Sequence, residues 1–425
     1  MGLARASTIR ELVLGSSQQV YPFGLVSGSD GAIWFADLGC TGSGACAIVR
    51  ISLDGRHVSN YGNGLGLRNV PFAVATGADG NVWFTDAGPK PAIGRITPTG
   101  QITLFTRGLR HGSVPFEIVA GAGGDLWFTD QGPRPAIGRI TPTGAITEYS
   151  RGLQRGSVPF GIAAAPHRQV WFTDRACDSS GHCAIGRIGS SGRIIEYRAG
   201  LDRNAQPLGI AATADGDAWF ADSSGAIGRV TPGGRIDELK AGLRRGSSPV
   251  AIAPGPGGGV WFTDDGSVRA IGHVSSTGQI TELTSGLIEG SLPSAIAPAS
   301  DGSLWFTDEG VGAVGSIDTG GPAAVRTRPV VKRPAHAGGP LRCAGARWTP
   351  WTGLRPSARL YPFDGYRWLR GGILIPGARA GSYTPSPADA GRQISCRVTV
   401  TYPPPFTVTA SATSDSIEVG STVSA

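Results

Sequence analysis

The sequence predicts an all-β protein: a seven-bladed β-propeller closed by its own N-terminal strand, followed by a small immunoglobulin-like β-sandwich. Three observations predict it. A Trp-Phe pair recurs seven times, at intervals of 42 to 49 residues. Each interval contains four short apolar runs separated by turn sequences. The last interval lacks its fourth run, and a matching run stands near the N-terminus. Repeats of this length with four strands each are typical of propellers.

Each repeat reads as four antiparallel strands. The first run follows a proline, as in Pro71-Phe72-Ala73-Val74, and the third reads Ala-Ile-Gly-Arg-Ile or a close variant of it. Turn signals such as Asp79-Gly80 separate the runs, since glycine tolerates the positive φ of tight hairpins. The second run carries the Trp-Phe pair, at Trp34, Trp83, Trp127, Trp171, Trp219, Trp261 and Trp305.

The ends of the repeat array predict how the ring closes. The last repeat has a third strand at Ala313–Ile317 and then loses the pattern at Gly320-Gly321. The N-terminal run Thr8–Leu12 resembles the fourth strand Ile280–Leu283 of the preceding repeat. We therefore expect the N-terminal run to complete the last blade and to cover its exposed edge.

A change of composition marks the end of the propeller, which we expect to span residues 1–319. Residues 320–339 are rich in proline and basic residues and read as a linker. Residues 340–425 contain Cys343, Trp348 and Cys396 in an order typical of immunoglobulin folds. The run Tyr366–Val398 resembles the Ig-like modules of exported bacterial proteins. This region is therefore predicted to be an Ig-like β-sandwich.

The net charge of +7 belongs to the C-terminal region. Residues 320–425 hold 13 Lys and Arg against 4 Asp and Glu, a net of +9, and residues 1–319 hold 25 against 27, a net of −2. A propeller without a positive field of its own is not expected to bind nucleic acid. The basic tail could contact an anionic cell wall. No apolar run is long enough to span a membrane, and we expect a monomer.

The six cysteines fall into three pairs that predict three disulfides: Cys40 with Cys46, Cys177 with Cys183, and Cys343 with Cys396. Disulfides indicate an oxidising compartment, so the protein is expected to be secreted or at the cell surface. The first residues contain no apolar signal core. A metal site at Cys177-Asp178 and His182-Cys183 is an alternative interpretation of the second pair.

Two repeated positions should meet on one face of the propeller, where the first strand starts and the second ends. Large apolar residues follow the strand-one proline at Phe23, Phe72, Phe116, Phe160, Leu208 and Val250, with Ser294 in the seventh repeat. They form either a ligand-binding floor or simple packing. Every second strand ends in aspartate, at Asp37, Asp86, Asp130, Asp174, Asp222, Asp264 and Asp308. These aspartates fix the turns, or Asp130, Asp174 and Asp264 also contact a ligand.

Glu117 breaks the repeat, since the matching residue is Gly or Ala in all other repeats. A carboxyl group beside an apolar mouth can act as a base with a raised pKa. Alternatively, Glu117 pairs with Arg110 or Arg155 from the neighbouring loops. These loops also carry Arg107, His111, Arg151, Arg244 and Arg245, which read as solvated charges or as a basic rim favouring an anionic or carbonyl-rich ligand.

The repeated unit, with its W-F-T-D and I-G-R-I-T-P-x-G signatures, resembles that of the streptogramin lyase (virginiamycin B lyase) family over residues 1–318. The resemblance implies a propeller and an Mg²⁺-dependent elimination that opens a cyclic depsipeptide ester. The family's catalytic histidines follow the strand-one proline in late blades, at the positions of Val250 and Ser294 here. Its glutamates correspond to Leu292 and Asp308.

The missing histidines favour an exported propeller that binds a small molecule or peptide, with no cofactor evident. A carbon–oxygen lyase that uses Asp308 or Glu117 with Mg²⁺ is the alternative. A sensor domain is a third interpretation.

Overall fold

The computed structural model describes residues 9–14, 20–39, 46–66, 68–178, 181, 183–213, 215–255, 259–275, 277–317, 325–332, 339–344, 347–348, 363–401 and 409–419. The chain divides into two compact units. One consists of Ser7–Gly255 and Gly259–Asp318, and the other includes Thr319–Ala425. Each unit is treated separately below.

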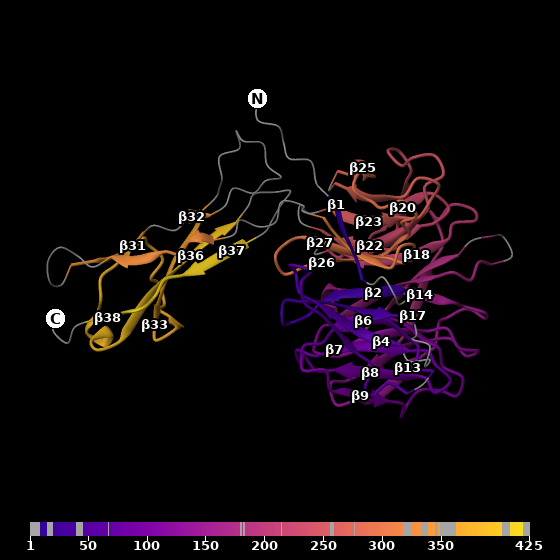
Figure 1. Cartoon of the computed structure of the whole chain (residues 1–425), viewed down its shortest axis with the longest axis horizontal. Helices are drawn as coiled ribbons and strands as arrows, with labels where there is room; N and C mark the ends of the chain where they lie inside the picture. The colour runs from indigo at the N-terminus through magenta and orange to yellow at the C-terminus, as the bar shows by residue number, and fades with distance from the viewer. Residues whose placement is uncertain are drawn as a thin grey trace. The chain divides into compact units, whose positions relative to one another are not determined.

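The first unit contains seven four-stranded antiparallel sheets, the blades (Figure 1). Every blade starts at a proline and has its first three strands in sequence order. Blade 1 contains β2 (Pro22–Ser27), β3 (Ile33–Asp37), β4 (Ala47–Ile51) and β5 (Val58–Tyr61). Blade 2 contains β6 (Pro71–Thr76), β7 (Val82–Asp86), β8 (Ala92–Ile96) and β9 (Ile102–Phe105). Blade 3 contains β10 (Pro115–Ala120), β11 (Leu126–Asp130), β12 (Ala136–Ile140) and β13 (Ile146–Tyr149).

The later blades repeat this pattern. Blade 4 contains β14 (Pro159–Ala165), β15 (Gln169–Asp174), β16 (Ala184–Ile188) and β17 (Ile194–Tyr197), with the short turn η1 (Pro166–Arg168) after β14. Blade 5 contains β18 (Pro207–Ala212), β19 (Ala218–Asp222), β20 (Ala226–Val230) and β21 (Ile236–Leu239). Blade 6 contains β22 (Pro249–Pro254), β23 (Val260–Asp264), β24 (Ala270–Val274) and β25 (Ile280–Leu283). Blade 7 contains β26 (Pro293–Pro298), β27 (Leu304–Asp308), β28 (Ala313–Ile317) and the N-terminal β1 (Ile9–Val13).

Strand β1 closes the ring, as the sequence predicts. It pairs antiparallel with β28 from Ile9 opposite Ile317 to Val13 opposite Ala313. In Figure 1 the indigo β1 lies among the orange strands of the last blade. The first strands of successive blades contact one another, and β2 contacts both β6 and β26. These first strands therefore form the inner wall of a closed ring, and all-β propeller architecture is confirmed.

The core lies between the blades, where the Trp-Phe strands pack. The phenylalanine of each pair is fully buried, and so are Trp34, Trp83 and Trp171. The phenylalanine also explains the glycine of the third strand. A Cβ at Gly138 would lie 2.0 Å from the Phe128 ring, and one at Gly94 equally close to Phe84. The ring and the glycine are thus a matched pair that brings the second and third strands together.

A buried threonine links neighbouring blades around the inner wall. The hydroxyl of Thr85 accepts a hydrogen bond from Ala73 N (3.1 Å) and donates one to Phe116 O in the next blade (2.5 Å). The same contacts recur at Thr129, Thr173 and Thr263. Each threonine therefore fixes the spacing of two adjacent first strands.

The second unit is built from short sheets around one disulfide. Its strands are β29 (Val325–Thr327), β30 (Val330–Lys332), β31 (Leu341–Ala344), β32 (Arg347–Trp348), β33 (Phe363–Arg370), β34 (Ile373–Leu374), β35 (Ser382–Tyr383), β36 (Gln393–Thr401), β37 (Thr409–Thr413) and β38 (Ile417–Glu418), with the short helix η2 (Pro387–Asp389). The Cys343–Cys396 bridge joins β31 to β36, which belong to different sheets. The fully buried Trp368 packs in the same cluster.

The expected linker differs from the structure. Residues 320–339 include β29 and β30, and β30 pairs with β31 so that Val331 lies opposite Cys343. The β-branched run Val330-Val331 supplies the strand that the proline content obscured. The immunoglobulin-like topology of the second unit, and the exact domain boundaries, stay predictions.

Within the described part of the chain, no helix is long and apolar enough to cross a membrane.

Candidate functional site: the mouth of the propeller

The aspartate at the end of each second strand anchors the loop that enters the same blade. In blade 7, Asp308 Oδ1 accepts hydrogen bonds from Leu292 N and Gly310 N, at 2.8 and 3.0 Å. Each of the other six aspartates accepts the equivalent pair of hydrogen bonds. One comes from the backbone N–H of the residue before the strand-one proline, and the other from the N–H two residues after the aspartate itself. The geometry matches the turn-fixing interpretation of these residues.

Burial limits what these aspartates can do at a surface. Asp130, Asp174, Asp264 and Asp308 are fully buried, and the second carboxylate oxygen of Asp308 contacts the Ser291 hydroxyl. These carboxylates are closed off from solvent, although Oδ2 of Asp130 and of Asp174 accepts no hydrogen bond among the described residues. The structure thus places the predicted catalytic Asp308 and the predicted ligand contacts Asp130, Asp174 and Asp264 beneath the mouth rather than on it.

The residues that follow the strand-one prolines form an aromatic wall on one side of the mouth. Phe23, Phe72, Phe116 and Phe160 come from four successive blades and are partly exposed. Ring centroids lie 5.6 Å apart for Phe23 and Phe72, 5.2 Å for Phe72 and Phe116, and 4.6 Å for Phe116 and Phe160. The sequence-predicted aromatic residues are therefore brought together as one continuous patch, here called the Phe wall.

The opposite side of the mouth has no aromatic ring at the corresponding positions. There the corresponding residues are Leu208, Val250 and Ser294. The residues directly after the buried aspartates differ from blade to blade: Leu38, Ala87, Gln131, Arg175, Ser223, Asp265 and Glu309. Burial raises the pKa of Glu309, the Ser294 hydroxyl lowers it, and the charges of Asp265 and Asp308 raise it further. Blades 6 and 7 thus face the Phe wall with two carboxyl groups.

Glu117 lies at the inner wall between Phe116 and the neighbouring blade. At the matching position of blade 4, a Cβ on Gly161 would lie 2.4 Å from Leu208 O, which shows how closely the first strands approach. Burial raises the pKa of Glu117 to about 7, and a backbone hydrogen bond from Ile118 opposes the rise. No ion pair to Glu117 occurs among the described residues.

The alternative interpretation, in which Glu117 pairs with Arg110 or Arg155, finds no such ion pair among the described residues. Arg110 Nε lies 3.1 Å from Glu148 Oε2 instead, and Arg244 pairs with Glu282 in the same way at 3.3 Å. Both glutamates sit on fourth strands, where the inter-blade loop passes closest. These two arginines therefore neutralise blade carboxyl groups and contribute little field to the mouth.

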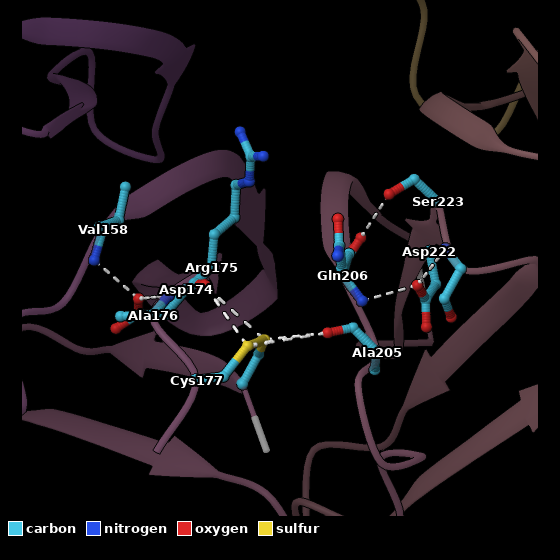
Figure 2. Close-up of a disulfide and its surroundings, with 11 residues drawn as sticks. Val158, Asp174, Arg175, Ala176, Cys177, Ala205, Gln206, Asp222 and Ser223 are labelled. Carbon is cyan, nitrogen blue, oxygen red and sulfur yellow. Dashed lines mark hydrogen bonds between the residues drawn. A yellow bond between two sulfur atoms is a disulfide. The ribbon is translucent and has the colours of Figure 1, made fainter. Parts of the chain in front are cut away.

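A disulfide stiffens one loop of the mouth. Cys177 and Cys183 are bonded, so the sulfurs are not thiolates available to a metal. Cys183 Sγ lies 2.9 Å from Ala205 O in the loop that enters blade 5. Figure 2 shows this bridge between the two loops, with the Arg175 side chain extending away from it. The Arg175 guanidinium lies 4.8 Å from the Phe160 ring centroid.

The other two disulfide predictions differ in outcome. The Cys343–Cys396 bridge is confirmed. Cys46 is buried, and its predicted partner Cys40 lies outside the described residues, as does His182.

Pairs of buried carboxyl groups in single blades escaped the sequence analysis. Glu148 lies beside Asp130, Glu238 beside Asp222, Glu282 beside Asp264 and Glu11 beside Asp308. Burial first, and the neighbouring aspartate next, raise the pKa of Glu148 to about 7 and that of Glu238 to about 8. The glutamate recurs in most fourth strands, and this recurrence was the signal in the sequence that could have revealed the pairs. Its meeting with the aspartate depends on the folded sheet.

Comparison with known proteins identifies the repeat. The profile of the virginiamycin B lyase family matches residues 7–284 and 223–340. A solved streptogramin B lyase structure is similar to this chain with 27% sequence identity and a TM-score of 0.63, over 73% of this chain and 97% of that one. No curated protein sequence matches the chain.

Two more distant structures share the fold alone. YCF48 bound to D1 peptide has 13% identity and a TM-score of 0.56, over 73% of this chain and 97% of that one. The extracellular domain of a putative hybrid two-component system from B. thetaiotaomicron has 12% identity and a TM-score of 0.56. That match covers 96% of this chain and 57% of the other.

Proposed function

The chain belongs to the virginiamycin B lyase family, and from this premise we propose that it is an exported binding propeller that takes a small molecule or peptide at its mouth. The single observation that carries the proposal is the Phe wall. Four partly exposed rings from four blades form a continuous apolar patch opposite the carboxyl groups of blades 6 and 7. An apolar surface with a few convergent polar groups is the usual composition of a ligand site.

The family's elimination chemistry has little support at this mouth. A lyase of this kind needs a base that removes the proton beside a carbonyl while the carbon–oxygen bond breaks. The positions of the family's histidines hold Val250 and Ser294. Asp308, at a glutamate position, binds backbone N–H groups and Ser291. None of these three side chains supplies a base that reaches a ligand.

The donor set also fits Mg²⁺ poorly. Mg²⁺ binds oxygen ligands in a near-octahedral shell and relies on carboxylates among them. Within the described ranges, no three Asp, Glu, His or Cys side chains are grouped to hold a metal ion. The oxygens of Asp308 already accept hydrogen bonds. The residues at Asp308 therefore do not form a Mg²⁺ site.

One observation favours a second candidate, a lyase of altered mechanism. Glu117 is partly buried, burial raises its pKa to about 7, and it forms no ion pair among the described residues. A carboxyl group of this kind is half ionised near neutral pH and can accept a proton from a substrate. The lyase alternative therefore assigns the base to Glu117 rather than to Asp308.

Export rests on the disulfides. Two bridges are present in the described residues, one in each unit. Disulfides persist in oxidising compartments and are rare in the reducing cytosol. Peptide mapping without reduction should recover both bridges from protein purified from its native host. Free thiols at Cys177 and Cys183 in that material would remove the argument for export.

One incubation separates the two candidates. A streptogramin B is mixed with the full chain and Mg²⁺, then followed by equilibrium dialysis and by chromatography with mass detection. Binding without turnover predicts that the protein holds the compound in dialysis and that the compound stays cyclic. The Phe116→Ala and Phe160→Ala variants should hold less of it. Turnover predicts a product of unchanged mass and new retention time that disappears in Glu117→Gln. If the wild type and both Phe variants bind the compound equally in dialysis, the proposed site is wrong.

A further inference from the structure

Glu117 is an isolated carboxyl group in a ring of small residues. The equivalent residues are Gly24, Ala73, Gly161, Gly209, Ala251 and Ala295. Adjacent first strands approach so closely there that a larger residue must extend along the inner wall. Glu117 is partly buried, and even partial burial of a carboxylate without a cationic partner is unfavourable. A cation delivered by a ligand would relieve that cost.

The backbone of Glu117 lies next to two residues that carry aromatic rings. Glu117 N donates to the Thr129 hydroxyl at 3.0 Å, and the same hydroxyl donates to Phe160 O at 2.9 Å. Phe116 precedes Glu117 in the chain, and its ring lies 4.6 Å from that of Phe160. A carboxyl group and two ring faces therefore start from neighbouring backbone positions. Ring faces carry partial negative charge and attract cations.

A cation of the protein already uses this wall. The Arg175 guanidinium lies over the Phe160 ring at 4.8 Å, although the Arg175 side chain is exposed to solvent. At the equivalent place the other blades have no cationic residue, since they carry Leu38, Ala87, Gln131, Ser223, Asp265 and Glu309. The Cys177–Cys183 bridge follows Arg175 directly and holds its loop against blade 5. Arg175 thus marks where a cationic group fits.

Charge on the far side of the mouth has the same sign as Glu117. Asp265 and Glu309 are partly buried there, and the nearby Arg244 is paired with Glu282. Carboxyl groups on both sides of the mouth would repel a ligand anion and attract a cation. Attraction is strong in such a partly enclosed site because water screens it less than at an open surface.

We propose that Phe116, Phe160 and Glu117 form a subsite for an organic cation, an ammonium or guanidinium group carried on an apolar body, and that Arg175 competes with it for the same ring face. This inference rests on the proposed binding function and names its ligand class. The apolar body packs on the Phe wall, and the cation points toward Glu117.

The test uses three probes with the same phenylalkyl body: phenethyl-trimethylammonium, 2-phenylethanol and 3-phenylpropanoate. Binding to the full chain is measured by ligand-observed NMR at millimolar probe concentrations. We expect the ammonium probe to bind about tenfold more tightly than the alcohol, and the carboxylate to bind most weakly. Binding of the ammonium probe should strengthen between pH 6 and pH 8, as Glu117 ionises around its pKa of about 7.

Matched variants assign the effect to residues. Glu117→Gln should remove both the preference for the ammonium probe and its pH dependence, and Glu289→Gln, an exposed change on blade 7, should leave both intact. Arg175→Gln should strengthen ammonium binding several-fold, whereas Arg175→Lys should not. Equal binding of the three probes, undetectable binding of the ammonium probe, or a preference unchanged in Glu117→Gln overturns the cation subsite.

The same experiment keeps the two proposals apart. If the alcohol or the carboxylate binds as tightly as the ammonium probe and is lost in Phe116→Ala, the mouth binds ligands and only the cation subsite is wrong. If every probe that binds the wild type binds Phe116→Ala and Phe160→Ala equally well, the proposed binding site itself is wrong.

Discussion

Glu11 on the closing strand and Asp308 on β27 share one serine. The Ser291 hydroxyl contacts Asp308 Oδ2 and also lies 3.3 Å from Glu11 Oε1. A hydroxyl has one proton, so if Ser291 donates to Asp308 it can only accept from Glu11. Glu11 can donate only when its carboxyl is protonated. Its other oxygen accepts a hydrogen bond from Ile288 N at 2.6 Å. Closure of the ring therefore includes a carboxyl pair that holds a proton.

This pair predicts that β1 docks less firmly at alkaline pH. Burial, and then Asp308, raise the pKa of Glu11 from 4.5 to about 7. The contribution to stability is complete below about pH 4.5 and is lost as pH rises through 7. With allowance for solvent screening, the loss is on the order of 1 kcal/mol. Hydrogen exchange of residues 9–13 should accelerate between pH 6 and pH 8 beyond the intrinsic pH effect.

Glu11→Gln supplies the control for that prediction. An amide donates to Ser291 at every pH, so the extra acceleration should disappear in this variant. Arg10→Gln, an exposed change on the same strand, should keep it. Identical pH profiles for the wild type and Glu11→Gln would show that the pair does not titrate in this range. Arg269, whose Nε donates to Ser291 O, is a cation close enough to mask the effect.

Thr85→Val tests the links between blades. The substitution keeps the shape of the side chain but leaves the buried Ala73 N–H and Phe116 C=O without this partner. Unpaired buried polar groups cost about 2 kcal/mol in total. Denaturant unfolding of the propeller should show this loss. Thr103→Val, on the exposed face of β9, is the matched control and should change stability by less than about 0.5 kcal/mol.

The sequence contained the architecture because each blade repeats the same local pattern. The Trp-Phe spacing indicated the blade count, and the run at Ile9–Leu12 indicated the closing strand. The seven aspartates were interpreted as turn devices because a residue required by every repeat serves the fold. Their hydrogen bonds agree with that interpretation.

The contacts that distinguish one blade from another were harder to predict. Whether Arg110 pairs with Glu117 or with Glu148 depends on the path of a loop, and Glu148 was not among the partners that the sequence suggested. The third-strand arginines behave similarly. Arg139 pairs with Asp125, which lies in the turn between the first two strands of the same blade. Arg187 instead donates to Pro232 O of the next blade. Long flexible side chains choose among partners that only the packed structure brings within reach.

Removal of the Cys343–Cys396 bridge should destabilise the second unit alone. The bridge closes a loop with a sequence separation of 53 residues, which corresponds to about 4 kcal/mol of chain entropy in the unfolded state. The double variant Cys343→Ser, Cys396→Ser should lose hydrogen-exchange protection in β33 and β36. Protection of blade strands such as β11 and β19 should not change. Equal protection of β33 and β36 with and without the bridge would contradict this expectation.

Asp389 predicts how the second unit responds to acid. Burial opposes its ionisation, but hydrogen bonds from Arg370, Tyr383 and Ser386 dominate and lower its pKa to about 2. A lowered pKa stabilises the folded unit above about pH 4, and this stabilisation is lost as pH falls toward 2. Tyr383→Phe removes the 2.6 Å hydrogen bond from Tyr383 and should cost about 1.5 kcal/mol at neutral pH. The free-energy cost of Tyr383→Phe should shrink at pH 2. A cost that is the same at pH 2 and at neutral pH would contradict the assigned role of Asp389.

The Cys177–Cys183 bridge should act on ligand binding through Arg175. The bridge packs against Ala205, and Asn204 N donates to Gly181 O at 2.9 Å, so the loop is held from both sides. The double variant Cys177→Ser, Cys183→Ser should free the loop and loosen Arg175 from Phe160. Ammonium binding should then strengthen, as in Arg175→Gln. Because both changes remove the same competitor, their effects on binding should not add when combined. Additive effects would mean that the bridge influences the mouth by another route, and faster hydrogen exchange in residues 175–178 of the double variant would confirm that the loop was freed.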